Sequence, residues 1–261
     1  MAVGRVIDTR NDDFKLGEVL YGWFGWQDYC VCQASSLLRR VDPQQAPIST
    51  AAGLLGINGL TAYLCLQDIG HPRPGETIVV TAAAGAVGSI VGQLAKQAGC
   101  RVVAVVGSDE KGERCLSDYG YDAYVNYRHP VEPALTAACP EGIDIFFDNV
   151  AGELADTIIR QMNVRGRVIQ CGTVSIASWV PQPLGPRIER EVLTRRLRIE
   201  GFVIFDHMDR FEAAADALAQ MLSDGRIRYD EDIETDIAGA PQALTDVYAG
   251  RNTGKKLIKL R

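Results

Sequence analysis

The residues from Thr81 to Gly88 have the types and spacing of a phosphate-binding turn. They follow an apolar run that begins at Ile78, and Ala83, Gly85 and Gly88 occupy the three glycine positions of a G-x-G-x-x-G pattern. Gly85 lets the backbone approach a pyrophosphate, and Gly88 lets the following helix pack on the strand. A turn that merely joins a strand to a helix is the alternative. Because a second strand follows in the expected order, the pattern favours a dinucleotide, bound at the helix N-terminus.

The choice of nucleotide depends on the residues that end the second strand. NAD-specific sites place a carboxylate about 20 residues beyond the glycines, where it binds the ribose 2′-OH. Here Gly107 and Ser108 leave room for a 2′-phosphate, and Lys111 supplies a cation for it. Asp109 is compatible with NAD, and Ser108 and Lys111 are also compatible with a helix cap and a solvated charge. The balance favours NADP(H).

Alternating strands and helices position this turn in the middle of the chain. Continuous apolar strands are expected at residues 78–81, 101–106, 123–126, 143–148, 166–171 and 198–202. Amphipathic helices are expected at residues 87–98, 110–119 and 152–162. Buried parallel strands covered by helices on both faces predict an α/β fold with a Rossmann-type doubly wound parallel sheet.

Both ends of the chain have a different pattern, rich in short strands. Residues 1–40 predict antiparallel strands near 3–7, 18–21 and 26–32, and a helical spacing covers 49–69. After a helix at 208–223 come a strand-like run to 237, a helix near 242–248 and a strand at 256–260. We therefore expect a partial β-rich domain from residues 1–55 and 231–261, and a dinucleotide-binding domain from 56–230.

Composition narrows the functional class. The net charge is −6, and acidic and basic residues are interleaved, which argues against nucleic-acid and membrane partners. The seven cysteines are scattered and odd in number, which predicts free thiols in a reducing compartment. The N-terminus has no apolar leader pattern, and no run is long enough to span a membrane, so a cytoplasmic location is expected.

Other catalytic classes fit the sequence poorly. A zinc site requires clustered Cys, His or Glu ligands, whereas none of the three histidines lies beside a cysteine pair and Cys30-x-Cys32 lacks the spacing of a structural site. No G-x-S-x-G elbow of a serine hydrolase is present, because Gly107-Ser108 is followed by Asp109-Glu110. We expect no bound metal.

Several motifs together resemble the zinc-independent medium-chain dehydrogenase/reductases, specifically the branch of prostaglandin, alkenal and curcumin reductases. The resemblance rests on Leu55 to Tyr63, on the Ala82–Gly88 turn and on Gly107 to Lys111. Further matches follow in the family's order at residues 126–128, 147–150, 166–167, 171–172, 201–203 and 252–256. The chain departs from the pattern at Asn58, where the family has proline, and the family begins with a longer β-rich catalytic domain.

The resemblance implies a binding site for NADP(H). Lys111 and Tyr127 are expected at the 2′-phosphate, and the turn residues at the pyrophosphate. The ribose and nicotinamide end is expected to involve Thr61, Asn149, Cys171, Phe202 and Asn252. The complete set of expected cofactor residues is Thr61, Gly85, Ala86, Val87, Gly88, Ser108, Lys111, Tyr127, Asn149, Cys171, Phe202, Val203 and Asn252.

The activity implied by the resemblance is reduction of the C=C bond of α,β-unsaturated ketones and aldehydes by NADPH, without zinc. Tyr63 and Tyr248 are weak candidates for donors to the substrate oxygen. Quinone reduction is an alternative, because the same hydride geometry serves quinones, and a non-catalytic NADPH-binding protein is another. Relatives commonly form dimers through their sheet edges, and the strand at 198–204 is expected to serve that role.

Overall fold

The computed structural model describes residues 1–260, which form two compact units. The sheet unit consists of Ala62–Val203, and the terminal unit consists of Met1–Thr61 with the chain from Ile204 onward. Helix α1 (Ile57–Cys65) contains the first boundary between them. Both ends of the chain therefore fold together, and the middle of the chain forms a unit of its own.

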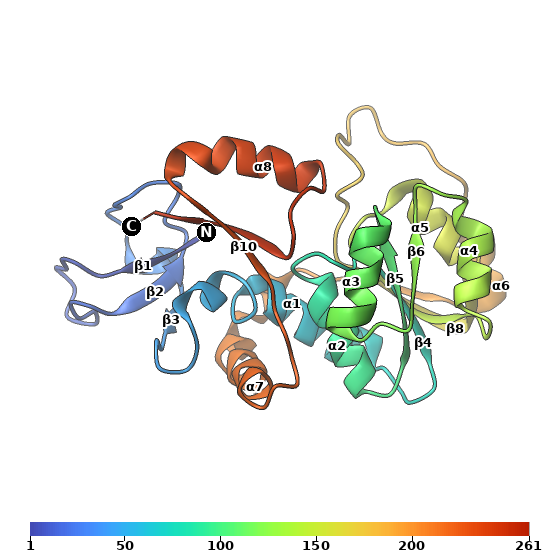
Figure 1. The fold of residues 1–261 in the computed structure, drawn as a ribbon, viewed down its shortest axis with the longest axis horizontal. Helices are drawn as coiled ribbons and strands as arrows, with labels where there is room; N and C mark the ends of the chain where they lie inside the picture. Colours follow the sequence, from blue (N-terminus) through green and yellow to red (C-terminus); the bar gives the residue numbers. More distant parts are fainter. Residues whose placement is uncertain (261) are drawn as a thin grey trace. The chain divides into compact units, whose positions relative to one another are not determined.

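The sheet unit contains six parallel strands (Figure 1). In chain order they are β4 (Thr77–Thr81), β5 (Arg101–Val106), β6 (Ala123–Asn126), β7 (Ile143–Asp148), β8 (Met162–Gln170) and β9 (Arg198–Gly201). Their spatial order is β6-β5-β4-β7-β8-β9, which is the 3-2-1-4-5-6 order of dinucleotide-binding folds. The expected Rossmann-type fold is confirmed, with the reversal of strand order between β4 and β7.

Helices and apolar side chains enclose the sheet. The helices of this unit are α2 (Gly88–Gln97), α3 (Asp109–Tyr119), α4 (Val131–Ala138), α5 (Gly152–Ile159) and α6 (Glu189–Arg195), and a π-helical turn at Leu66–Gly70 follows α1. Val79, Val103 and Phe146 of the central strands pack with Leu135 of α4 and Ile158 of α5 in one buried cluster. Burial on both faces explains why these strands are continuously apolar.

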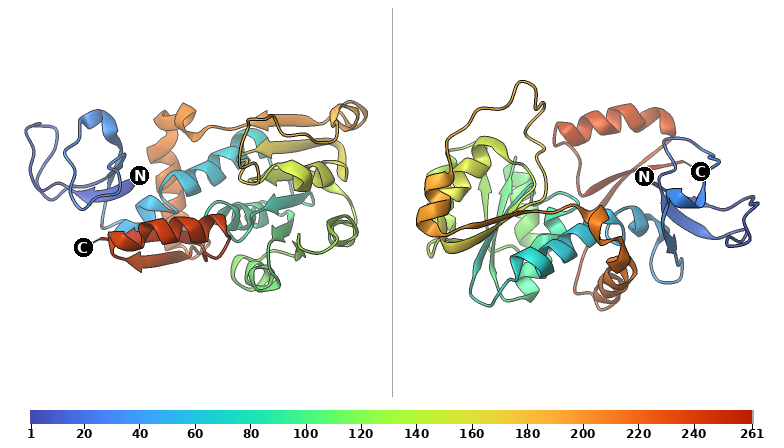
Figure 2. Two further views of the ribbon diagram at one scale, coloured as in Figure 1. Left: turned by 90° about the horizontal axis from the view of Figure 1, so that it is seen from above. Right: turned by 180° about the vertical axis from the view of Figure 1, so that it is seen from behind.

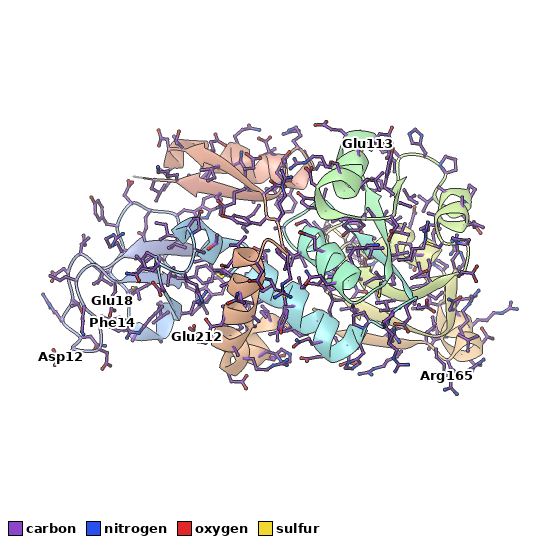
Figure 3. All side chains as sticks on the ribbon, turned by 60° about the horizontal axis from the view of Figure 1, so that its bottom comes forward. Asp12, Phe14, Glu18, Glu113, Arg165 and Glu212 are labelled. Atoms are coloured by element: carbon purple, nitrogen blue, oxygen red, sulfur yellow. The ribbon has the colours of Figure 1, made fainter. Side chains whose placement is uncertain are left out.

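The terminal unit contains two small sheets. Strands β1 (Ala2–Arg5), β2 (Val19–Gly22) and β3 (Leu37–Val41) are antiparallel, and β10 (Glu231–Thr235) pairs in parallel with β11 (Lys255–Lys259). Arg40 of β3 forms an ion pair with Glu18 and lies over the ring of Phe14, both labelled in Figure 3. These contacts tie the loop before β2 to the sheet.

Helix α7 (Phe211–Ser223) belongs to the terminal unit, whereas the sequence pattern placed it with the dinucleotide-binding domain. The unit boundaries lie at 61/62 and 203/204 instead of 55/56 and 230/231. Arg39 of β3 forms an ion pair with Glu212, and Gln45 donates to Asp216 over 2.9 Å. Amphipathic spacing predicts that a helix has an apolar face but not which unit that face covers, so the sequence could not assign α7 to a unit.

Two local predictions were wrong. Residues 26–32 form an irregular segment whose apolar side chains are exposed instead of buried on a sheet face, and the third strand is β3 further on. The helical run 49–69 is broken into a 3-10 turn (Ile48–Ala52), helix α1 and the π-helical turn. Asn58 consequently lies in the first turn of α1, where its Oδ1 atom is buried without a hydrogen-bond partner.

The segment between β8 and α6, residues 171–188, is irregular and projects from the sheet unit in the right-hand view of Figure 2. Helices α4 and α6 were not expected, because each is short and lacks a long apolar periodicity. The terminal unit also contains α8 (Ala240–Tyr248), as its sequence pattern predicted. Among residues 1–260, no helix combines the length and the apolar content required to cross a lipid bilayer.

Candidate dinucleotide-binding site

The turn between β4 and α2 is a tight backbone loop at the carboxyl edge of the sheet. Ala82 has a φ of 50°, and the Gly85 N–H donates to the Ala82 carbonyl over 2.9 Å. A Cβ atom at Gly88 would lie 2.5 Å from that carbonyl oxygen and 2.7 Å from Ala83 Cα, so no larger residue fits there without a shift. At Gly85 the nearest atom would be the same oxygen, at 3.0 Å. Gly88 is therefore required by packing, and a Cβ at Gly85 would meet one backbone oxygen in a tight contact.

The first turn of α2 is suited to an anion. Val87 precedes the helix, and no side chain in the described part of the chain caps this end. The Ser89 and Ile90 N–H groups bond to the carbonyls of Gly85 and Val87, and the helix dipole favours a negative charge at this end. Inside the turn, the buried Tyr121 hydroxyl donates to the Gly88 carbonyl over 2.7 Å. This bond anchors the start of α2 to the beginning of β6.

A buried polar network joins the ends of β4 and β7. The Thr81 hydroxyl donates to Asp148 Oδ1 over 3.1 Å and accepts from the Asn149 N–H over 2.9 Å. The Asn149 amide then donates to the Thr81 carbonyl over 2.8 Å. Asp148 is fully buried and also accepts from the N–H groups of Val150 and Ala151. Asn149 is thus held rigidly beside the phosphate-binding turn.

The ends of β8 and β9 bring further predicted residues to the same edge. The Cys171 N–H donates to the Asp148 carbonyl over 2.8 Å, and the Phe202 N–H donates to the Gln170 carbonyl over 3.2 Å. Val203 follows directly and is half exposed. The thiol of Cys65, at the end of α1, lies within hydrogen-bond reach of Cys171, and burial raises the pKa of Cys65 far above its usual range.

The ends of β5 and β6 form a second corner, which we call the 2′ corner and define as Ser108, Asp109, Lys111, Asn126, Tyr127 and Arg128. The Ser108 hydroxyl caps α3 by accepting from the Lys111 N–H over 3.3 Å. A Cβ atom at Gly107 would lie 2.6 Å from the Tyr127 hydroxyl, so the phenol ring covers this glycine. Burial is the main cause that lowers the pKa of Lys111, and the positive charge of Arg128 also lowers it.

Asp109, the residue that kept NAD open as an alternative, has a protein partner. Its Oδ1 atom accepts from the Asn126 amide over 3.0 Å. A carboxylate that already accepts this bond is a poorer ligand for a ribose 2′-OH, and Lys111 and Arg128 lie close enough to influence each other's charge. The charges of the 2′ corner therefore fit the extra phosphate of NADP(H).

Three predicted residues belong to the terminal unit. Thr61 is in α1 at the boundary of the units, and Tyr248 and Asn252 belong to the terminal unit. Tyr248 is exposed at the end of α8, and the Asn252 amide donates to the Gly254 carbonyl over 2.8 Å. Their relation to the cofactor stays a prediction.

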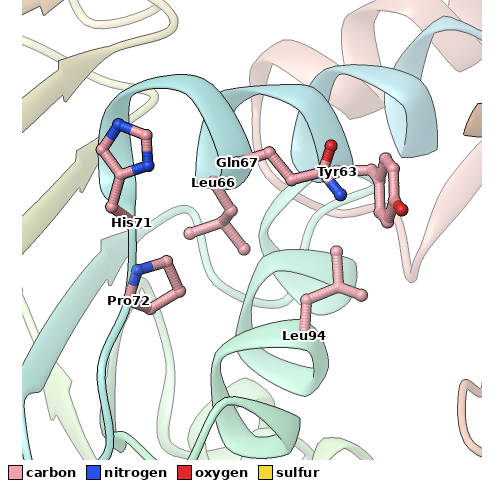
Figure 4. Close-up of a pocket in the computed structure, with 6 residues that line it drawn as sticks. All are labelled: Tyr63, Leu66, Gln67, His71, Pro72 and Leu94. Atoms are coloured by element: carbon pink, nitrogen blue, oxygen red, sulfur yellow. The ribbon is translucent and has the colours of Figure 1, made fainter.

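Tyr63 lines a shallow pocket of about 180 Å³ (Figure 4). The lining comes from α1, the turn that follows it and α2, and comprises Tyr63, Leu66, Gln67, His71, Pro72 and Leu94. Leu94 is in the second half of α2, and Pro72 precedes the amino end of β4. None of the predicted cofactor residues is among the pocket's lining residues.

Sequence reasoning missed the residues that support the site. Thr81, Tyr121, Asn126 and Asp148 all bind backbone or side-chain groups of predicted site residues. Asn126 and Asp148 were inside matched motifs, but Tyr121 carried no signal. A polar residue that ends a continuous apolar strand, as Thr81 and Asp148 do, is the pattern that could have identified two of them.

Within residues 1–260 no three His, Cys, Asp or Glu side chains are grouped so that they could hold a metal ion. The side chains present therefore do not fit a resident zinc ion. The glycine turn, the uncapped helix and the 2′ corner do fit a dinucleotide phosphate. Fold and site together define a dinucleotide-binding protein of the doubly wound α/β class.

Comparison with known proteins identifies the family. The sequence pattern of the zinc-binding dehydrogenases matches residues 86–220. The chain belongs to this family, within the NADP-dependent, zinc-independent branch of the medium-chain dehydrogenase/reductases. NADP(H) is its cofactor, and the chain is an NADPH-dependent oxidoreductase.

Individual relatives align over nearly the whole chain. The putative NADP-dependent oxidoreductase YfmJ of Bacillus subtilis is 40% identical over 99% of this chain and 77% of its own length. The NADP(+)-dependent 2-alkenal reductase of Nicotiana tabacum is 34% identical over 98% of this chain and 75% of its own length. The structure of CurA from Vibrio vulnificus in complex with NADPH has a TM-score of 0.90 at 33% identity and covers 99% of this chain and 80% of its own.

Proposed function

We propose that this oxidoreductase reduces the C=C bond of α,β-unsaturated ketones and aldehydes. The main support for the proposal is that one edge of a single sheet brings together the phosphate-binding turn, Asn149, Cys171 and the 2′ corner. The similarity to a 2-alkenal reductase supports the substrate class. The β-carbon of the conjugated carbonyl is then the atom that accepts the hydride.

The residues of the sheet unit bind and orient the cofactor in this proposal. NADPH, when bound, supplies the hydride. The turn at Gly85, Ala86 and Val87 holds the pyrophosphate, and Lys111 and Tyr127 hold the 2′-phosphate. Asn149, Cys171, Phe202 and Val203 line the ribose and nicotinamide end. Because the Thr81–Asp148 network is rigid, it fixes the ribose end without further adjustment.

The negative charge that develops on the substrate carbonyl oxygen requires a hydrogen-bond donor. Tyr63 and Tyr248 are the candidate donors among side chains. Tyr63→Phe and Tyr248→Phe test them separately. A donor variant lowers kcat for the enone while the NADPH dissociation constant stays unchanged, and a tyrosine whose variant keeps full kcat has no such role.

The first experiment is a titration of the chain with NADPH and with NADH, followed by NADPH absorbance as enones and quinones are added. Tighter NADPH binding with enone-dependent oxidation supports the proposal. Oxidation by quinones alone assigns quinone reduction instead. NADPH binding without any turnover assigns the second class, a non-catalytic nucleotide-binding protein.

A variant pair tests the 2′ corner within the same titration. Lys111→Met removes the cation expected at the 2′-phosphate, and Lys15→Met removes an exposed cation of the terminal unit as a matched control. We expect about tenfold weaker NADPH binding for Lys111→Met, with NADH binding unchanged. Equal losses for both nucleotides would remove Lys111 from the phosphate site.

The free edge of β9 also supports a homodimer. Strand β9 pairs only with β8 in the sheet, and Ile199 lies 40% exposed between Arg198 and Glu200. Antiparallel pairing of two copies centred on Ile199 places each Arg198 opposite the other copy's Glu200. Ile199→Lys is expected to yield a monomer by size-exclusion chromatography with light scattering, whereas Val164→Lys, also at an exposed position, leaves the mass unchanged.

A cytoplasmic location belongs to the same proposal. All seven cysteines carry free thiols, and the two in the loop at 30–32 are exposed. Exposed thiol pairs persist in a reducing compartment. Fractionation of the source cells tests this location.

A further inference from the structure

Asn126 joins the two halves of the 2′ corner through one side chain. Its Nδ2 atom donates to Asp109 Oδ1 over 3.0 Å, and its Oδ1 atom accepts from the Arg128 N–H over 3.1 Å. The Asn126 carbonyl accepts from the His129 N–H, again over 3.1 Å. The last residue of β6 therefore holds both the first residue of α3 and the turn that carries Tyr127 and Arg128.

The charge of Asp109 gives this contact a consequence for nucleotide choice. A carboxylate just beyond the second strand binds a ribose 2′-OH and repels a 2′-phosphate. Asp109 is exposed, so packing does not restrain its side chain. The amide of Asn126 is a hydrogen-bond donor that occupies one of its oxygens. Without that donor the carboxylate is free to rotate toward a bound ribose.

The other charges of the corner favour a phosphate. Lys111 is half-buried, and the nearby charges that act on it include those of Glu110, Arg114 and Arg128. Arg128 is exposed, and its backbone position is set by the bond to Asn126 Oδ1. The same amide thus restrains the acidic group and places a second cation beside Lys111.

We propose that Asn126 is a positioning residue that sets the preference for NADPH over NADH. It acts by holding the Asp109 carboxylate on its amide and by fixing the turn that presents Arg128 to the 2′-phosphate. Asn126 itself needs no contact with the nucleotide. The proposal concerns the cofactor of the chain and does not depend on the substrate proposed above.

The test measures dissociation constants for NADPH and NADH by quenching of protein fluorescence, so it requires no turnover. Asn126→Ala is expected to weaken NADPH binding about tenfold and to leave NADH binding equal or tighter. Asp109→Asn removes the carboxylate, and the double variant Asp109→Asn with Asn126→Ala is expected to regain part of the lost NADPH affinity, because the bond to the Arg128 N–H stays absent. Arg128→Met is expected to weaken NADPH and spare NADH.

A structural role for Asn126 alone predicts a different pattern. Equal loss of both nucleotides in Asn126→Ala, or a double variant no better than the single, overturns the proposal. If Asn126→Ala does not fold, Asn126→Asp is measured instead. This variant keeps an oxygen that accepts from the Arg128 N–H. It replaces the amide that donates to Asp109 by a second negative charge. The proposal requires Asn126→Asp to lose NADPH affinity selectively, and unchanged selectivity in this variant also overturns it.

Discussion

The Thr81 hydroxyl and the Asp148 carboxylate, 67 residues apart in sequence, meet at 3.1 Å in the fully buried interior of the sheet. The same hydroxyl accepts from the Asn149 N–H, so one oxygen links the ends of the two central strands. A carboxylate with no exposed surface is stable there because four donors, from Thr81, Val150, Ala151 and Gln170, surround it. These hydrogen bonds join β4 and β7, the two strands between which the strand order reverses.

Thr81→Val tests that link. The substitution keeps the shape of the side chain but removes one donor to Asp148 and the acceptor of the Asn149 N–H. We expect a loss of about 1–3 kcal/mol in the free energy of unfolding, measured in urea, together with weaker NADPH binding. Thr157→Val, which removes an exposed hydroxyl on α5, is the control and stays within about 0.5 kcal/mol. Wild-type stability for Thr81→Val would show that the network contributes little.

Tyr121→Phe tests the anchor of α2. The variant leaves the Gly88 carbonyl without the hydroxyl that donates to it over 2.7 Å in a buried site. A loss of about 1–2 kcal/mol in unfolding free energy is expected. Tyr124→Phe removes a more exposed hydroxyl that donates to Glu113 and is the matched control. If Tyr121→Phe and Tyr124→Phe lose the same unfolding free energy, the buried hydrogen bond contributes no more to stability than the exposed one.

The two glycines of the turn separate packing from binding. Gly88→Ala is expected to destabilise the fold, because its Cβ would meet backbone atoms at 2.5 and 2.7 Å. Gly85→Ala is expected to lose less stability than Gly88→Ala, because its Cβ would meet a single backbone oxygen at 3.0 Å, but to bind NADPH poorly, since its Cβ occupies the space of the pyrophosphate. Thermal unfolding and fluorescence titration of both variants check this split. Gly201→Ala, whose Cβ would contact nothing within 4 Å, is the control.

Buried thiols predict a loss of stability in alkali. Burial raises the pKa of Cys100 and Cys139 to about 11 and that of Cys115 to about 12. Between the ordinary thiol value near 9 and these values, the unfolded chain releases protons that the folded chain retains. The stabilising contribution is therefore complete below about pH 9 and decreases as the pH rises, by at most about 1.4 kcal/mol per pH unit for each thiol.

Urea unfolding at pH 8, 9 and 10 measures this slope. Cys115→Ala is expected to make it shallower, and Cys32→Ala, which removes an exposed thiol, is expected to leave it unchanged. A slope that is the same in all three proteins would assign the alkaline loss to other groups.

The sequence alone determined the parts of the fold that depend on local pattern. Continuous apolar strands identified β6 and β7 to the residue, and the glycine spacing placed the phosphate-binding turn between β4 and α2. The motifs also predicted NADP(H), because Gly107, Ser108 and Lys111 suit a 2′-phosphate. The fold and the cofactor are confirmed, because periodicity and turn chemistry act over a few neighbouring residues, and the roles of the individual site residues stay predictions.

Tertiary structure decided which distant residues support those motifs. The pairs Thr81 with Asp148 and Tyr121 with Gly88 are joined only once β7 and β6 take their places in the sheet. Asp109 was ambiguous in the sequence, and only the fold shows that its carboxylate accepts from the Asn126 amide at the end of β6. Hydrogen bonds between the ends of separate strands depend on strand order and register, and neither leaves a mark in local sequence spacing.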